Sequence, residues 1–112
     1  MPQIPTQVSF RNMDQPLNLV GQIHEKVADL EKVYPRLTAC RVMVERRNHR
    51  HPMGELFHVR IDVTIPGAEL VVSREPSEAE AYQDIKTTVQ TAFDQIRRQL
   101  ENHVSRTRTG VH

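Results

Sequence analysis

FHVRIDVTIPGAELVVSRE, residues 57–75, is the stretch that decides the fold of this 112-residue chain. Its first half alternates apolar with polar residues, the period of a strand that is buried on one face only. Pro66 and Gly67 then predict a turn, and the apolar run after them predicts a returning strand. The stretch is therefore a hairpin whose apolar face must be covered, while its other face carries His58 and Arg60.

The sequence before this hairpin predicts two strands with a helix between them. Residues 6–12 and 37–45 alternate in the same way. Between them, apolar residues recur at spacings of three and four and predict a helix that ends before Pro35, with Asp14 as N-cap and Pro16 in the first turn. The expected buried stripe of this helix is Leu17, Val20, Ile23, Val27, Leu30 and Tyr34.

The sequence after the hairpin predicts one long helix. Ser77 and Glu80 have the spacing of a capping box, which favours a helix start there. Its expected buried stripe is Ile85, Val89, Ala92, Ile96 and Leu100. We expect this helix to fray beyond Val104, so that residues 1–104 form a single domain and residues 105–112 a basic, flexible tail.

The order strand, helix, three strands, helix predicts an α+β fold. Three strands joined by short connections form an antiparallel meander, and both helices must cover its apolar face. The expected architecture is a two-layer β-α-β-β-β-α sandwich with a four-stranded, mainly antiparallel sheet, like that of double-stranded-RNA-binding domains. A chain of this length supports one modest core.

Charge is segregated along the chain although the net charge is only +1. Residues 41–50 and 95–112 each contain four arginines and one acid, whereas residues 76–94 are acidic. A nucleic-acid partner would therefore be bound through local basic patches. Aromatic residues make up 4% of the chain, and Phe10 and Phe57 fall on expected core faces, so contacts to phosphates are favoured over base stacking.

Several classes of function find little support in the sequence. No apolar run is long enough for a membrane span, and the N-terminus lacks the pattern of a secretory signal, so we expect a cytoplasmic protein. The single cysteine, Cys40, alternates with valines and is expected to be a buried core thiol. His49, His51 and His58 suggest a metal site only weakly, because no cysteine or acid completes a ligand spacing. We expect no cofactor, and an enzyme is the least favoured class.

Four blocks of the sequence resemble the ribosome hibernation family. They are EKVADLEKVYPRL at 25–37, ACRVMVE at 39–45, FHVRIDVTIPGAELVVSREP at 57–76 and AFDQIRRQLE at 92–101. The family includes hibernation promoting factor and the ribosome-associated inhibitor called factor Y, also labelled sigma-54 modulation proteins. The resemblance covers residues 6–104 and points to the short, single-domain form.

The resemblance implies a partner and a mechanism. Members bind the small ribosomal subunit in the channel for messenger and transfer RNA, and they inhibit translation sterically, without an active site. The expected partners are therefore this subunit and its ribosomal RNA, with no DNA and no membrane, and the protein is expected to be a monomer in solution. The positions that match basic residues of the family are Lys26, Arg41, Arg60, Arg74, Arg97 and Arg98.

Three further cations are added from the residues themselves. Arg46 and Arg47 lie in a basic loop that could clamp phosphates, and Lys86 shares a helix face with Arg97. Each candidate also has a structural reading as a solvated loop or a surface ion pair. Arg97 and Arg98 could pair with Asp94 and Glu101 at helical spacing, and Arg60 could pair with Glu45 across strands.

Two other functions remain open at this point. One is a general structured-RNA-binding or RNA chaperone module, which would bind free RNA as well as subunits. The other is a protein-interaction module, whose binding would depend little on salt.

Overall fold

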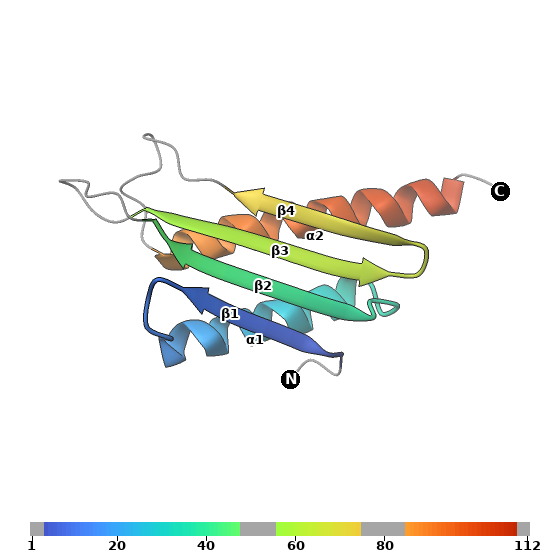
Figure 1. The fold of residues 1–112 in the computed structure, drawn as a ribbon. Helices are drawn as coiled ribbons and strands as arrows, with labels where there is room; N and C mark the ends of the chain where they lie inside the picture. Colours follow the sequence, from blue (N-terminus) through green and yellow to red (C-terminus); the bar gives the residue numbers. More distant parts are fainter. Residues whose placement is uncertain (1–3, 48–55, 75–84, 110–112) are drawn as a thin grey trace.

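The computed structural model describes residues 4–47, 56–74 and 85–109, and its elements follow the predicted order (Figure 1). They are β1 (Thr6–Arg11), α1 (Leu17–Val33), β2 (Ala39–Arg46), β3 (Phe57–Ile65), β4 (Ala68–Arg74) and α2 (Ile85–Thr109). This confirms the predicted α+β class. Within the described ranges, no helix has the length and apolar character needed to cross a membrane.

The four strands form one mixed sheet in the order β1-β2-β3-β4. β1 pairs in parallel with β2, whereas β2, β3 and β4 form the predicted antiparallel meander. A parallel pair requires a crossover connection, and α1 provides it. The turn between β3 and β4 contains Gly67 with a φ of 82°, a left-handed conformation that favours glycine.

Both helices lie on the same face of the sheet and run in the same direction (Figure 1). α1 packs beneath β1, and α2 packs beneath β3 and β4. Near their C-terminal ends, the rings of Tyr34 and His103 meet edge to face with centroids 6.3 Å apart. Neither helix covers the other face of the sheet, the open face, and the domain measures 52 × 27 × 17 Å.

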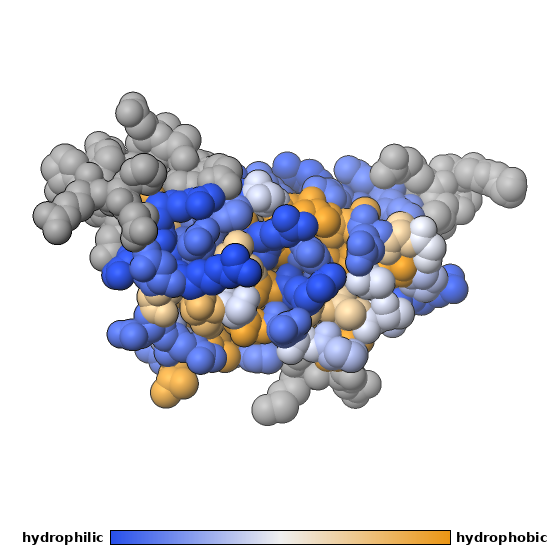
Figure 2. Space-filling view, in the orientation of Figure 1, coloured by the Kyte–Doolittle hydropathy of each residue, from blue (hydrophilic) through white to orange (hydrophobic). Residues whose placement is uncertain are grey.

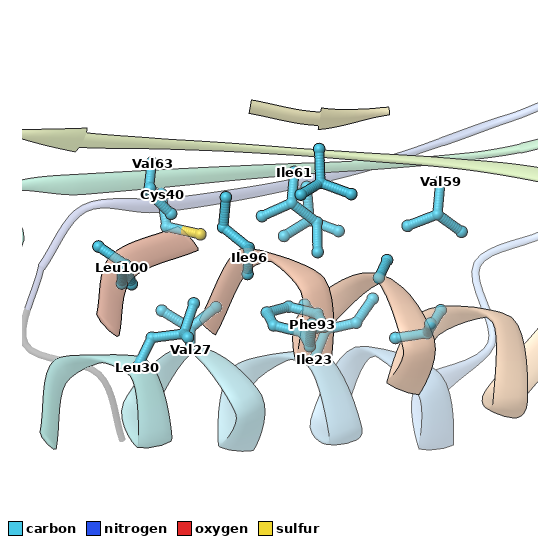
Figure 3. Packing of buried hydrophobic residues seen from close by; sticks show 14 of the residues in the cluster. Ile23, Val27, Leu30, Cys40, Val59, Ile61, Val63, Phe93, Ile96 and Leu100 are labelled. Atoms are coloured by element: carbon cyan, nitrogen blue, oxygen red, sulfur yellow. The ribbon is translucent and has the colours of Figure 1, made fainter. Parts of the chain in front are cut away.

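The core lies between the sheet and the two helices (Figure 3). The alternating residues of β2 and β3 point into it, as predicted, and the helices cover them with one apolar stripe each. Its buried members from the sheet are Cys40, Val42, Val44, Val59, Ile61, Val63, Ile65 and Val72. Those from the helices are Leu19, Ile23, Val27, Leu30, Val89, Ala92, Phe93, Ile96 and Leu100.

The start of α1 differs from the prediction. Pro16 is the N-cap, with extended backbone, and its carbonyl accepts a hydrogen bond of 3.0 Å from the Val20 N–H, so Asp14 does not cap the helix. The buried stripe begins at Leu19, while Leu17 is 83% exposed. Two residues are separated by about 200° on a helix, so burial of Leu19 places Leu17 on the solvent side.

The end of α2 also differs from the prediction. The helix continues to Thr109, beyond Val104, where fraying was expected. The predicted capping box at residues 77–80 lies outside the described residues. Of the predicted stripe, Val89, Ala92, Ile96 and Leu100 are buried and Ile85 is partly buried against the core.

Candidate nucleic-acid interface

The open face of the sheet is formed by every second residue of each strand. Because the opposite set of side chains is apolar and covered by the helices, the polar set is left in solvent. Figure 2 shows this face, with hydrophilic residues extending across the strands and apolar ones between them. Its residues are Gln7, Ser9, Arg11, Arg41, Met43, Glu45, His58, Arg60, Asp62, Thr64, Glu69, Val71 and Ser73.

A shallow hollow of about 360 Å³ lies across β1, β2 and β3 on this face. Arg41 and Arg60, two of the predicted site residues, both line it. A third arginine, Arg11, lines it too and was missed by the sequence analysis. Its position in the alternating pattern, one residue after the inward-facing Phe10, was the signal that could have identified it.

Two arginines of the open face, Arg41 and Arg60, are paired with carboxylates. Arg60 Nε donates to Asp62 Oδ1 at 3.0 Å, and Arg41 Nη2 lies 3.9 Å from Glu69 Oε1. The suggested pairing of Arg60 with Glu45 is wrong, because the strand register places Met43 opposite Arg60. The side chains of Arg41 and Arg60 remain 59% and 49% exposed, so both stay accessible to a ligand.

Glu45 instead contacts Arg47 and His58. Arg47 Nη1 donates to Glu45 Oε1 at 3.1 Å, and His58 Nδ1 lies 3.8 Å from the same oxygen. His58 Nε2 and Ser73 Oγ are 2.9 Å apart, within hydrogen-bond distance. These contacts bury His58 at the sheet surface, and they place Arg47 beside the open face.

The described ranges contain no cluster of three or more side chains of the kinds that hold metal ions. His49 and His51, the other two histidines considered for a metal, lie outside the described residues. His58 has its contacts with Glu45 and Ser73 within the sheet. The described part of the chain therefore gives no support to a metal site.

Cys40 lies on the opposite side of β2, in the core. Burial raises the pKa of its thiol from 9.0 to about 12, and the negative charge of Asp62 adds to the effect. The thiol is therefore protonated at neutral pH and is not a nucleophile. This confirms the prediction of a core cysteine.

The three candidate cations of α2, Lys86, Arg97 and Arg98, lie on two different sides of the helix. Lys86 and Arg97, eleven residues apart, share one side, and Arg97 Nε lies 4.0 Å from Glu101 Oε1. Arg98 instead lines a hollow of about 380 Å³ between α2 and β4. Beside it, Gln99 Nε2 donates to the backbone carbonyl of Val71 at 3.3 Å.

The three remaining candidates lie away from the open face. Lys26 is half-buried on α1. Arg46 and Arg74 end their strands in the set of positions that faces the helices, and both are half-buried. The structure thus gathers Arg11, Arg41 and Arg60 on one surface, with Arg47 beside it. Arg98 lies at the border of this surface, next to β4, and the other candidates lie around the helical layer.

Comparisons with known proteins agree with this fold. Residues 6–108 match the family described as sigma 54 modulation protein / S30EA ribosomal protein. Among solved structures, the Protein Y N-terminal domain of Thermus thermophilus has a TM-score of 0.68 and 18% identity, over 89% of this chain and 97% of that one. A ribosomal subunit interface protein from Coxiella burnetii has a TM-score of 0.65 and 13% identity, over 91% of this chain and 99% of that one. No curated protein sequence matches this chain.

Proposed function

This chain belongs to the family of sigma 54 modulation proteins and S30EA ribosomal proteins, and from that membership we propose that it is a ribosome-associated hibernation factor. It binds the small ribosomal subunit in the channel for messenger and transfer RNA. Occupation of that channel blocks translation sterically, so the protein needs no active site. The observation that carries this proposal is the family match over residues 6–108.

The open face supports ribosomal RNA as the ligand. Arg11, Arg41 and Arg60 stand on three neighbouring strands of a rigid sheet, around one hollow. A guanidinium group presents several N–H donors in a plane, which suits contacts with phosphate oxygens. No Phe or Tyr of the described residues lies on this face, so RNA would be bound through its backbone and its shape rather than by stacked bases.

Two surfaces contribute to binding in this proposal. The first is the open face, which Arg98 extends across the hollow beside β4, and the second is the side of α2 that carries Lys86 and Arg97. The domain is long and flat, 52 × 27 × 17 Å, so its two layers can contact RNA on both sides of a narrow channel. Lys26, Arg46, Arg47 and Arg74 extend these contacts at the edges of the two surfaces.

Co-sedimentation with purified small subunits tests the proposal. The salt concentration is raised in steps, with an excess of bulk RNA present. We expect retention that declines steeply with salt yet resists the competitor, because a shaped site is reached through phosphate contacts. Log affinity falls as log salt rises. In the triple variant Arg11→Ala, Arg41→Ala, Arg60→Ala this slope should be less steep by about 3, roughly one for each lost phosphate contact.

Lys32→Ala is the control for loss of a single cation elsewhere, because Lys32 is exposed and lines the hollow between α1 and the N-terminal end of β1, away from the open face. Its slope should equal that of the wild type. If bulk RNA removes the wild-type protein from subunits, the protein is a general RNA-binding module instead. If the protein never sediments with subunits, the family fold is present without ribosome binding.

A further inference from the structure

Acidic and basic side chains alternate on the open face. Its three arginines, Arg11, Arg41 and Arg60, are accompanied by three acids, Glu45, Asp62 and Glu69. The strand register places Glu45 directly beside Arg11 and Asp62 directly beside Arg41. The surface that should attract phosphates is therefore close to neutral as a whole.

The acids contact the guanidinium groups that a phosphate would bind. Asp62 accepts from Arg60 Nε at 3.0 Å and is also the neighbour of Arg41 across the strands, so it influences two of the three arginines. Glu69 of β4 also reaches Arg41, at 3.9 Å, from the same side as Asp62. A phosphate that approaches either arginine meets a carboxylate at short range and must displace it.

These ion pairs contribute little to the stability of the sheet. Arg60 and Asp62 lie two residues apart on the same strand, so their contact does not join β3 to a neighbour. Arg41 and Glu69 lie on β2 and β4, with β3 between them, and their side chains are about 60% exposed. Exposed pairs such as Arg41–Glu69 contribute little to stability, so a ligand with several phosphates can displace them. Asp62 is less exposed, at 20%, but its partner Arg60 is 49% exposed and accessible to the same ligand.

We propose that Asp62 and Glu69 mask the arginines of the open face and thereby lower its affinity for every RNA, so that only an RNA with several well-placed phosphates binds strongly enough to remain attached. A flexible RNA places one or two phosphates at a time and is repelled by the acids. A rigid RNA surface that presents several phosphates at matching positions displaces both acids together. The inference rests on the proposed function, because it assigns to the ribosomal RNA the role of that rigid ligand.

The double variant Asp62→Asn, Glu69→Gln tests this inference. Its affinity is measured for a short single-stranded RNA oligomer and for small subunits, at one moderate salt concentration. The oligomer should bind the double variant about tenfold more tightly than it binds the wild type, because two masked cations become available for phosphate contacts. Affinity for subunits should rise by at least the same factor, because a ligand that displaces both acids in the wild type no longer has to displace them in the variant.

The matched control is Asp29→Asn, Glu25→Gln. It changes the net charge by the same amount, but both residues line a hollow between α1 and the N-terminal end of β1, away from the open face. Its affinity for the oligomer should change less than about twofold, because it releases one isolated cation, Lys32, and otherwise alters only long-range attraction. Thermal unfolding of both variants verifies that the fold is retained.

The results separate this inference from the proposed function. If affinity for the oligomer rises equally in both double variants, the total charge is responsible and the positions of Asp62 and Glu69 do not matter. No rise in oligomer affinity for the open-face variant would likewise overturn the masking. Failure of the wild-type protein to bind subunits would contradict the proposed function alone, since the oligomer measurement does not involve the ribosome.

Discussion

Arg97 and Arg98 are adjacent in the sequence but lie on different sides of helix α2. Arg98 lines the hollow between α2 and β4, together with Val71 and Ser73, which also belong to the open face of the sheet. Arg97 lies about 100° away around the helix and pairs with Glu101 at 4.0 Å. Arg98 is therefore continuous with the open face, whereas Arg97 belongs to the helical layer.

The two arginines should consequently differ in their effect on binding. Arg98→Ala is expected to weaken binding to small subunits about fivefold at moderate salt, through the loss of one phosphate contact beside the open face. Arg97→Ala should weaken it less than about twofold, because its charge is already opposed by Glu101. Co-sedimentation of the two single variants measures the difference. Equal losses would show that the outer side of α2 contacts RNA as closely as the open face does.

A second prediction concerns the core. Leu100 is fully buried at 0% exposure, whereas Leu17 is 83% exposed, so the same substitution can be compared in two environments. Leu100→Ala should lower the free energy of unfolding by about 2–5 kcal/mol, from lost apolar burial and the cavity left behind. Leu17→Ala should change it by less than about 0.5 kcal/mol. Urea denaturation measures both, and similar losses would contradict the observed start of α1.

A third prediction compares two glycines. Gly67 has a φ of 82°, so Gly67→Ala should destabilise the protein by about 1–2 kcal/mol through strain in the turn. Gly21 lies in α1, and an added Cβ there would have no heavy atom within 4 Å. Gly21→Ala should therefore stabilise the protein by about 0.5–1 kcal/mol. Melting temperatures that shift in the same direction for both variants would be inconsistent with these backbone conformations.

A fourth prediction follows from the raised pKa of Cys40. The folded thiol has a pKa of about 12 and the unfolded one a pKa near 9.0, so the folded state holds this proton more tightly. Its contribution to stability is complete below pH 9 and is lost as the pH rises towards 12. The free energy of unfolding should therefore fall more steeply between pH 8 and pH 11 in the wild type than in Cys40→Ala. Parallel pH profiles would show that Cys40 is accessible to solvent.

The fold could be predicted from the sequence wherever one strong period governs a segment. Alternation from Val59 to Ile65 was enough to define β3 and its buried face, because a strand that slips by one residue exposes its whole apolar set. The start of α1 was mispredicted because Leu17 and Leu19 offer two apolar stripes, and only contact with the sheet selects one of them.

The candidate site was less predictable because it depends on register. Arg41 and Arg60 were identified, but their partners Glu69 and Asp62 were not. Glu69 reaches Arg41 only because β3 holds β2 and β4 in register, which no local pattern shows. Asp62 lies two residues from Arg60 on the same face of β3, so the alternation could have identified it. Arg11 was missed for a related reason. The sequence does not show that β1 lies in parallel beside β2, which is what brings Arg11 to the same hollow.

The hydrogen bond from Gln99 to the carbonyl of Val71 has a consequence for the behaviour of the protein at high concentration. β4 is an edge strand, and the unpaired backbone groups of an edge can recruit a strand from another molecule and begin aggregation. Gln99 occupies one of these carbonyls from within the same chain. Through this hydrogen bond, α2 makes part of the β4 edge unavailable for pairing with a strand of another molecule.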